Sequence, residues 1–348
     1  MNKTILTFRT VSLTVLAAVA IGAGAEASAF AQTFAFQDSS TQLRIDNNGS
    51  VVSTGHNMKS GTVPSQVPTL NGSYYVGYQG SNGHFWADAN GQEFLDSGGW
   101  MSAGTSPSIT ILGHVLAFGF QGSNGHLWIG LDGIFSGVDT GWQMASGTSP
   151  SVAALSNGKV AEAFHGSNGD FWISMYAPGG GFDTGVGMAP GTSPSIAALP
   201  NSQIAYAFQG ASGTHSTGGL WFGEGNGIGG TQRDSALTPN TSPSVAADSA
   251  GNAFVAYQDT YDGEQFGELV ILTCNTTGSG SCQALGAGCI NVALSASPRV
   301  VSFNGAYQDP DGNLEPNFDY EIAYKGLNGN LWIDSRFVGC VDQGIAMN

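Results

Sequence analysis

An amide, an indole and a small polar side chain recur together at a fixed spacing in this chain of 348 residues. The segment Phe-Gln-Gly-Ser-Asn-Gly-His-Leu-Trp at 120–128 is the clearest copy. An amide can donate to one hydroxyl and accept from its neighbour, and an indole offers a flat apolar face that can stack on a sugar ring. These residue types therefore point to recognition of a neutral saccharide.

Aligning the copies against one another gives columns from which we take the candidate binding residues. The amide column ends the second apolar run of each copy, the polar column begins the third run, and the indole follows two residues later. From the most complete copies the candidates are Gln79, His84, Trp86, Gln121, His126, Trp128, His165, Asp170 and Trp172. Gln209 and Trp221 form a weaker set, because residues 215–219 lengthen their turn.

Part of this pattern has a purely structural explanation. The turn asparagines at 82, 124, 168 and 328 suit a tight turn, and the Thr-Ser-Pro runs suit the start of a strand. A Gln side chain is usually exposed unless its amide is paired. The indoles could either bind a ligand or fill the wedge between neighbouring sheets, as large aromatics do. The sequence leaves both roles open for the indole column.

The repeat predicts the elements that position these columns. Gly-Thr-Ser-Pro-Ser at 104–108 returns at 147–151 and 191–195, and the equivalent prolines along the chain lie 43 to 55 residues apart. Each copy has four short apolar runs separated by Gly, Pro, Asn and Ser, which is typical of four antiparallel strands. Asn-Gly between the second and third runs predicts a hairpin with a type I′ turn. A period of roughly 40–50 residues is that of a propeller blade.

We therefore predict an all-β protein, a β-propeller of about seven four-stranded blades that forms one domain at 32–348. A partial blade at 34–57 lacks the strand that starts with Thr-Ser-Pro, and further blades start near 58, 101, 144, 188, 237 and 292. The Gly-Ser-Asn-Gly turns and the Gly-Thr-Ser-Pro loops should share one face of the ring. Because the chain ends where the next Thr-Ser-Pro strand would begin, ring closure has no obvious strand exchange to rely on.

The N-terminus and the cysteines indicate export. Lys3 and Arg9 precede an apolar run at 11–25, and small-residue cleavage sites follow, so we expect residues 1–31 to be a cleaved signal peptide and the protein to be secreted. No other run is long and apolar enough to cross a bilayer. An even number of cysteines in an exported chain suggests disulfides. Of the possible pairings we favour Cys274–Cys282, across a Gly/Ser-rich hairpin, with Cys289–Cys340.

Charge and missing motifs argue against several functions. The 25 acidic and 9 basic residues give a net charge of −16, which disfavours nucleic acid and anionic membranes as partners. A glycosidase needs paired carboxylates at a set separation. The recurring acids Asp96, Asp139, Asp183 and Asp342 lie in the outer strand, where a turn or surface role suits them better. Nucleophile-elbow and zinc-protease motifs do not occur in the chain.

One acidic loop has a different chemistry. Residues 309–315 carry oxygen-bearing side chains at alternate positions, an arrangement that favours Ca²⁺. The glycine at 312 is misplaced for an EF-hand, so a solvated acidic loop is the alternative. The weak calcium candidates are Asp309, Asp311, Asn313 and Glu315. Beyond this loop we expect no metal site and no cofactor.

The unit Thr-Ser-Pro-Ser…Phe-Gln-Gly-Ser-Asn-Gly-His-Leu-Trp resembles the repeat of bacterial propeller lectins of the Photorhabdus fucose-lectin type. It is even more similar to the tandem repeats of secreted actinobacterial proteins. The resemblance covers residues 34–348, is best from 58 to 235, and implies sugar pockets between adjacent blades. Two copies depart from the pattern, with Arg44 and Val270 in place of the indole.

Together these observations predict a secreted, non-catalytic lectin that binds glycans or glycoconjugates through several weak sites between blades. The first alternative is a propeller that serves protein interaction or structure and has no small ligand. The second is a glycoside hydrolase. Binding of a saccharide without turnover would separate the lectin from both alternatives.

Overall fold

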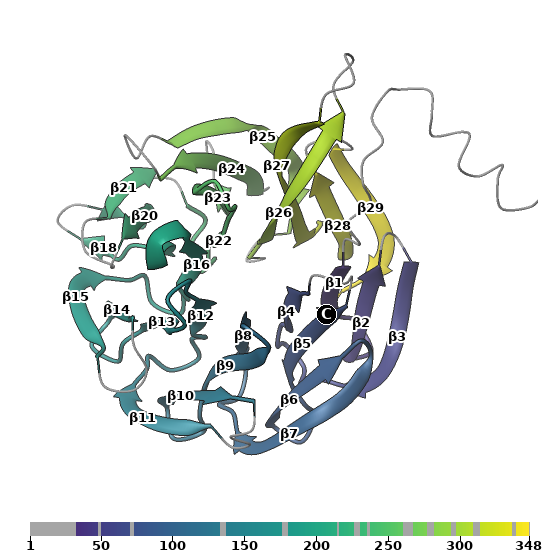
Figure 1. Cartoon of the computed structure of the whole chain (residues 1–348), viewed down its shortest axis with the longest axis vertical. Helices are drawn as coiled ribbons and strands as arrows, with labels where there is room; N and C mark the ends of the chain where they lie inside the picture. Colours follow the sequence, from purple (N-terminus) through teal and green to yellow (C-terminus); the bar gives the residue numbers. More distant parts are fainter. Residues whose placement is uncertain are drawn as a thin grey trace, which may run out of the picture.

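The apolar runs of each repeat form antiparallel strands that pair in sequence order. In the computed structural model, seven such sheets surround a central axis as a β-propeller (Figure 1). The first blade has three strands and the other six have four, as the sequence predicts. The structure describes residues 33–347 except 48–49, 70–72, 133–136, 176–179, 214–215, 226–229, 235–236, 260–266, 277–281, 294–296, 309–313 and 336–338.

The strands of each blade follow one another from the axis outward (Figure 1). The first four blades consist of β1 Thr33–Gln37, β2 Gln42–Asn47 and β3 Ser50–Asn57; β4 Ser65–Pro68, β5 Tyr74–Gln79, β6 His84–Ala89 and β7 Gln92–Trp100; β8 Ser108–Leu112, β9 Val115–Gln121, β10 His126–Leu131 and β11 Val138–Gln143; and β12 Ser151–Ala154, β13 Val160–His165, β14 Asp170–Ser174 and β15 Phe182–Gly187.

The fifth blade carries an inserted hairpin, and the sixth and seventh blades carry the longest strands. The last three blades consist of β16 Ser195–Leu199, β17 Gln203–Gln209, β20 Leu220–Gly225 and β21 Thr231–Asp234; β22 Ser244–Ala247, β23 Asn252–Asp259, β24 Gly267–Asn275 and β25 Cys282–Val292; and β26 Arg299–Gln308, β27 Leu314–Lys325, β28 Asn330–Ser335 and β29 Gly339–Ala346. The inserted hairpin pairs β18 Ser212–Gly213 with β19 Ser216–Thr217. Among the described residues the one helical segment is the 3₁₀ turn η1 Pro200–Ser202, and no helix there is long and apolar enough to span a membrane.

The hairpin between the second and third strands has a different turn from the one predicted. Gly125 has φ of +82°, but Asn124 is not among the residues with positive φ, so the turn is not type I′. Gly122 N–H instead donates to His126 O and Gly125 N–H donates to Gly122 O, both at 2.8 Å. The Asn side chain accepts from the His126 N–H at 3.1 Å. A side-chain bond of this kind stabilises a turn without a left-handed Asn.

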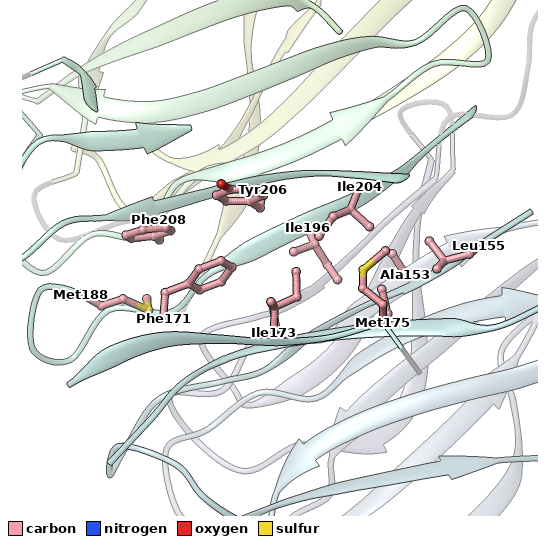
Figure 2. Close-up of a cluster of buried hydrophobic side chains, with 12 residues drawn as sticks. Ala153, Leu155, Phe171, Ile173, Met175, Met188, Ile196, Ile204, Tyr206 and Phe208 are labelled. Carbon is pink, nitrogen blue, oxygen red and sulfur yellow. The ribbon is translucent and has the colours of Figure 1, made fainter. Parts of the chain in front are cut away.

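The core lies between the blades. Each cluster of buried apolar side chains joins one blade to the next, as Figure 2 shows for the fourth and fifth blades. There Phe171 of β14 stacks on Tyr206 and Phe208 of β17, with ring centroids 5.2 and 4.7 Å apart. Side chains alternate between the two faces of a strand, and both faces of a blade pack against neighbours. Every cluster therefore needs two blades.

The Thr-Ser-Pro-Ser motif ties neighbouring blades together around the axis, beyond the strand-starting role expected for it. Its first Ser accepts from the preceding blade, as Ser149 Oγ does from Ser106 N–H at 2.9 Å. Its second Ser accepts from the following blade, as Ser108 Oγ does from Val152 N–H at 3.0 Å. Equivalent bonds join Ser149 to Ser193, Ser193 to Ser242, Ser242 to Ser297, Ile109 to Ser65, Ile196 to Ser151, Val245 to Ser195 and Val300 to Ser244.

The ring closes through the same contact that joins the other blades. A residue at the end of each outer strand bridges to the position after the second strand of the next blade, as Met101 does with Gly122. Met347 forms the equivalent bridge with Asp38 of the first blade. Ser39 N–H also donates to Ala346 O at 3.2 Å. No described strand is exchanged between blades, in agreement with the sequence-based expectation.

Cys274 and Cys282 form the predicted disulfide between β24 and β25. Cys340 on β29 is also disulfide-bonded. The side chain of its expected partner Cys289 lies outside the described part of the structure, but their strands β25 and β29 are neighbours. The predicted signal peptide at 1–31 also lies outside the described residues.

The calcium prediction stays untested. Asp309, Asp311 and Asn313 lie outside the described residues, as does the side chain of Glu315, whose backbone belongs to β27. Within the described part of the chain no group of three or more His, Cys, Asp or Glu side chains is arranged to hold a metal ion. The remaining candidates for a site are therefore the repeated columns.

Candidate functional site

The turns at 80–83, 122–125, 166–169 and 326–329 lie next to the loops that lead from one blade to the next, and we call this face of the ring the rim. Ser102 N–H donates to Gln121 O, and Ser123 N–H donates to Trp100 O, both at 2.8 Å. These bonds join the end of the second blade to the turn of the third. The predicted common face for the two kinds of loop is therefore confirmed.

The amide column is buried and serves the fold. Gln121 has 0% of its surface exposed. Its Nε2 donates to Ala145 O at 2.9 Å, and its Oε1 accepts from Gly147 N–H at 3.3 Å. Both partners belong to the loop that starts the next blade. The amide thus staples the third blade to the fourth.

The other members of this column behave in the same way. Gln79, His165 and Gln209 are at most 2% exposed, and each bonds to a backbone carbonyl of the following loop. A side chain that is buried and bonded to backbone has no surface to offer a ligand. The structure thus corrects the sequence-based interpretation of Gln79, Gln121, His165 and Gln209, which staple blades rather than contact a sugar.

The indoles are half-buried and held in place on one side. Trp128 Nε1 donates to Asn124 Oδ1 at 3.1 Å, and the ring stacks on Phe120 with centroids 6.1 Å apart. The same bond from indole to Asn is formed by Trp86, Trp172 and Trp332. The turn asparagines therefore have a second role beyond the turn. The indoles do pack between neighbouring blades, and only the exposed part of each ring can contact a ligand.

Glycine and tryptophan occur together because the indole lies against the glycine. A Cβ on Gly122 would lie 2.4 Å from Trp128 Nε1. The same position is Gly in all five blades with an indole, and a Cβ there would lie 2.3 to 2.6 Å from the ring. The first and sixth blades have Asp38 and Asp259 at this position and lack the indole. In the first blade Arg44 replaces it and pairs with Asp38, Nε to Oδ2, at 2.6 Å.

A polar cluster accompanies the indole on the rim of the third blade. His126 Nδ1 lies 3.0 Å from Asp139, and Asn124 Nδ2 donates to Asp139 Oδ2 at 2.8 Å. Burial acts to raise the pKa of Asp139, but hydrogen bonds from Gly141, His126 and Asn124 outweigh it and lower the pKa below its ordinary value. The ionised carboxylate therefore orients both the imidazole and the amide. In the second blade His84 pairs with Asp96 in the same way, with Nδ1 at 3.1 Å from Oδ1.

Asp170 replaces the histidine in the fourth blade. Asn168 Nδ2 donates to Asp170 Oδ2 at 2.9 Å and to Asp183 Oδ2 at 2.6 Å. Burial and the charge of Asp183 raise the pKa of Asp170. Two carboxyl groups that share one amide donor leave no room for the substrate that must lie between the acid and base of a glycosidase. This pair therefore does not have the geometry of glycoside hydrolysis.

The fifth blade keeps the indole but not the cluster. Trp221 stacks on Phe208 with centroids 6.0 Å apart. The turn is replaced by the β18–β19 hairpin, so the Asn that fixes the other indoles has no equivalent here. Gln209 uses its amide partly for this longer turn, donating to Gly218 O at 3.1 Å. The lengthened turn that the sequence shows in this copy is the β18–β19 hairpin.

A histidine that the columns did not single out lies at the junction of the first and second blades. His56 Nε2 lies 3.0 Å from Asp88 Oδ2, and its Nδ1 lies 3.1 Å from Glu93 Oε1. Tyr78 O–H donates to the same Glu93. Burial raises the pKa of Asp88, against hydrogen bonds from Gly91 and His56. No column predicts this cluster, because the other copies do not repeat the histidine.

No protein-family model and no curated protein matches the chain. Solved structures do. The fucose-specific lectin from Aleuria aurantia aligns with a TM-score of 0.52 at 10% identity, over 82% of this chain and 94% of the lectin. A mutant of AofleA from Arthrobotrys oligospora aligns with a TM-score of 0.52 at 14% identity, over 93% of this chain and 90% of that chain. The Aleuria lectin is six-bladed, one blade fewer than this protein. The chain therefore shares the β-propeller fold of fucose-specific lectins.

Proposed function

We propose that this protein is a secreted, non-catalytic lectin of the bacterial propeller type that binds neutral glycans on its rim. The observation that carries the proposal is the recurring cluster of the second to fourth blades. In each, a half-exposed indole with its N–H fixed by Asn lies beside an imidazole or carboxylate. Because these side chains are already held in place, little conformational entropy is lost when a ligand binds. A ligand that makes few contacts can therefore still bind to such a cluster.

The proposed sites leave out the amide column, because its side chains are buried. The indole edge supplies apolar surface, and the neighbouring His or Asp supplies the polar contact to a hydroxyl. The proposed sites are His84 with Trp86, His126 with Trp128, and Asp170 with Trp172. Trp221 is a weaker member. Each exposes a small surface, so each should bind weakly, and several on one rim would supply avidity towards a glycan-coated surface.

The charge of the molecule narrows the class of glycan. A net charge of −16 and a carboxylate in each cluster disfavour sialylated or sulfated sugars. Neutral pyranosides are therefore the proposed ligands. Fucosides are the first to try, because a fucose-specific lectin is among the structures with the same fold.

Titration calorimetry tests the proposal with methyl α-fucoside, methyl β-galactoside and N-acetylglucosamine, together with an array of neutral glycans. We expect binding of at least one saccharide, with a stoichiometry above one per chain. No binding of any saccharide at millimolar concentration would contradict the proposal and leave a protein-interaction propeller. A separate assay would use chromogenic glycosides of the same sugars. Release of the chromogenic aglycone from one of them would support the glycoside hydrolase instead.

His126→Ala tests one rim site with little disturbance of the core, because the side chain lies on the rim and is 30% exposed. We expect the stoichiometry measured by calorimetry to fall by the third-blade site, with little change in melting temperature. His114→Ala is the matched control, since His114 is an exposed histidine in the β8–β9 turn of the same blade. An unchanged stoichiometry in His126→Ala would exclude the third-blade cluster as a site.

A further inference from the structure

Trp100 at the end of β7 is 61% exposed, the largest exposed fraction of any large apolar side chain in the described part of the chain. The equivalent positions in the next two blades hold Gln143 and Gly187, so Trp100 belongs to no column. It does not fill a wedge between blades, in contrast to Trp128. An indole left this exposed forfeits the favourable burial of its large apolar surface. The position therefore calls for a role outside the core.

The indole of Trp100 is nevertheless held in one orientation. Trp100 pairs with His84 across β7 and β6, and the two rings meet edge to face with centroids 4.7 Å apart and an interplanar angle of 79°. A Cβ added to Gly83 would lie 3.5 Å from the ring, so the indole also lies over the turn glycine. A large flat apolar surface is thus presented to solvent on the rim.

The neighbouring histidine is oriented as well. His84 Nδ1 lies 3.1 and 3.3 Å from the two carboxylate oxygens of Asp96. A carboxylate can only accept, so Nδ1 carries a proton and Nε2 is left on the other side of the ring. None of the hydrogen bonds described for this part of the chain uses His84 Nε2 or Trp100 Nε1. The Trp100 residue is mostly exposed and the His84 side chain is 20% exposed, so the pair presents surface to solvent.

We propose that Trp100 and His84 form a saccharide-binding platform on the second blade, stronger than the indole clusters of the third and fourth blades. This inference rests on the proposed lectin function and assigns its main site. A neutral pyranoside stacks its apolar face on Trp100 and bonds one hydroxyl to His84 Nε2. The surrounding rim residues Ser81, Asn82 and Asp96 are polar and exposed. A single indole among polar side chains suits a sugar, whereas the centre of a protein interface is a larger apolar patch.

The experiment uses the full mature chain and the same three probes, methyl α-fucoside, methyl β-galactoside and N-acetylglucosamine, followed by calorimetry and by tryptophan fluorescence. Trp100→Ala should weaken the tightest site at least tenfold and abolish the fluorescence change that accompanies its filling. Trp100→Phe should retain part of the affinity. His84→Gln should weaken the same site several-fold. Because Trp100 is mostly exposed, the melting temperature of Trp100→Ala should stay close to that of the wild type.

Phe94→Ala is the matched control, since Phe94 is an exposed aromatic residue on the same strand, 43% exposed. It should leave binding unchanged. If the wild type binds a saccharide and Trp100→Ala keeps the affinity and the stoichiometry, the platform is overturned while the lectin function stands. If the wild type binds none of the probes or array glycans, both are overturned.

Discussion

Glu162 is a charged residue type at a position where the equivalent residues of other blades are apolar. It lies in β13 with 0% of its surface exposed, where other blades have Val76, Phe118 and Val255. Burial raises the pKa of Glu162 to about 8, against a hydrogen bond with Ser174 that acts in the opposite direction. At pH 7 the carboxyl is therefore mostly neutral in the folded protein. In the unfolded chain its pKa returns to an ordinary value of about 4.3.

This difference predicts a pH-dependent stability. Between about pH 4.5 and pH 8 the folded state binds the proton and the unfolded state does not, so the contribution of Glu162 to stability falls as the pH rises. The slope is at most about 1.4 kcal/mol per pH unit. Denaturant unfolding of Glu162→Gln should show a shallower pH dependence in this window and higher stability at pH 8. Asp132→Asn, which removes an exposed carboxylate, is the control, and an unaltered slope in Glu162→Gln would refute the assignment.

At the scale of elements, the blades are joined by side chains as much as by apolar packing. The amide column and the Ser pairs bond to the backbone of the neighbouring blade at every junction for which they are described. Backbone groups buried between sheets need such partners, because an unpaired group costs about 1–3 kcal/mol. The polar residues that recur most regularly in the chain therefore belong to the fold, and the less regular ones on the rim are left for a ligand.

Gln121→Ala tests this division. It removes the partner of Ala145 O and Gly147 N–H, so we expect a loss of about 1–3 kcal/mol in the free energy of unfolding, measured in denaturant. Saccharide binding should be retained, because the amide does not reach the surface. Gln203→Ala at the exposed start of β17 is the control. If Gln121→Ala kept normal stability but lost saccharide binding, the Gln121 amide would belong to the binding site and not to the contact between blades.

At the scale of the whole molecule, the junction between the last and first blades lacks a set of bonds that the other blades share. The first blade has no Thr-Ser-Pro-Ser motif, so the Ser bonds that join the other blades have no counterpart there. Among the described residues, the last blade contacts the first through the bridge of Met347 to Asp38 and the bond from Ser39 N–H to Ala346 O. Both come from the last three residues of the chain. A propeller is stabilised as a closed ring, since each core cluster spans two blades.

Deletion of residues 346–348 should therefore lower the melting temperature more than its few contacts suggest. The loss of the backbone hydrogen bonds at Ala346 and Met347 is worth about 1 kcal/mol each, and a protein of this size loses roughly 1–2 °C per kcal/mol. A broader transition by calorimetry would show that the terminal blades unfold separately. Met347→Ala keeps the backbone contacts and serves as the control. An unchanged melting curve of the truncated chain would show that packing alone closes the ring.

The sequence alone determined the features that depend on neighbouring residues. The repeat period predicts the blades, the Asn-Gly segments predict the hairpins, and the spacing of Cys274 and Cys282 predicts their bond, because each of these features forms within one continuous stretch of the chain. The tertiary structure decided which polar groups remain available. Gln121 and Ala145, or Ser106 and Ser149, meet only when two blades pack, and no local pattern states which edge of a blade faces the next. Trp100 belongs to no column, so the pattern assigns it no role, and only the folded ring shows that its indole is exposed.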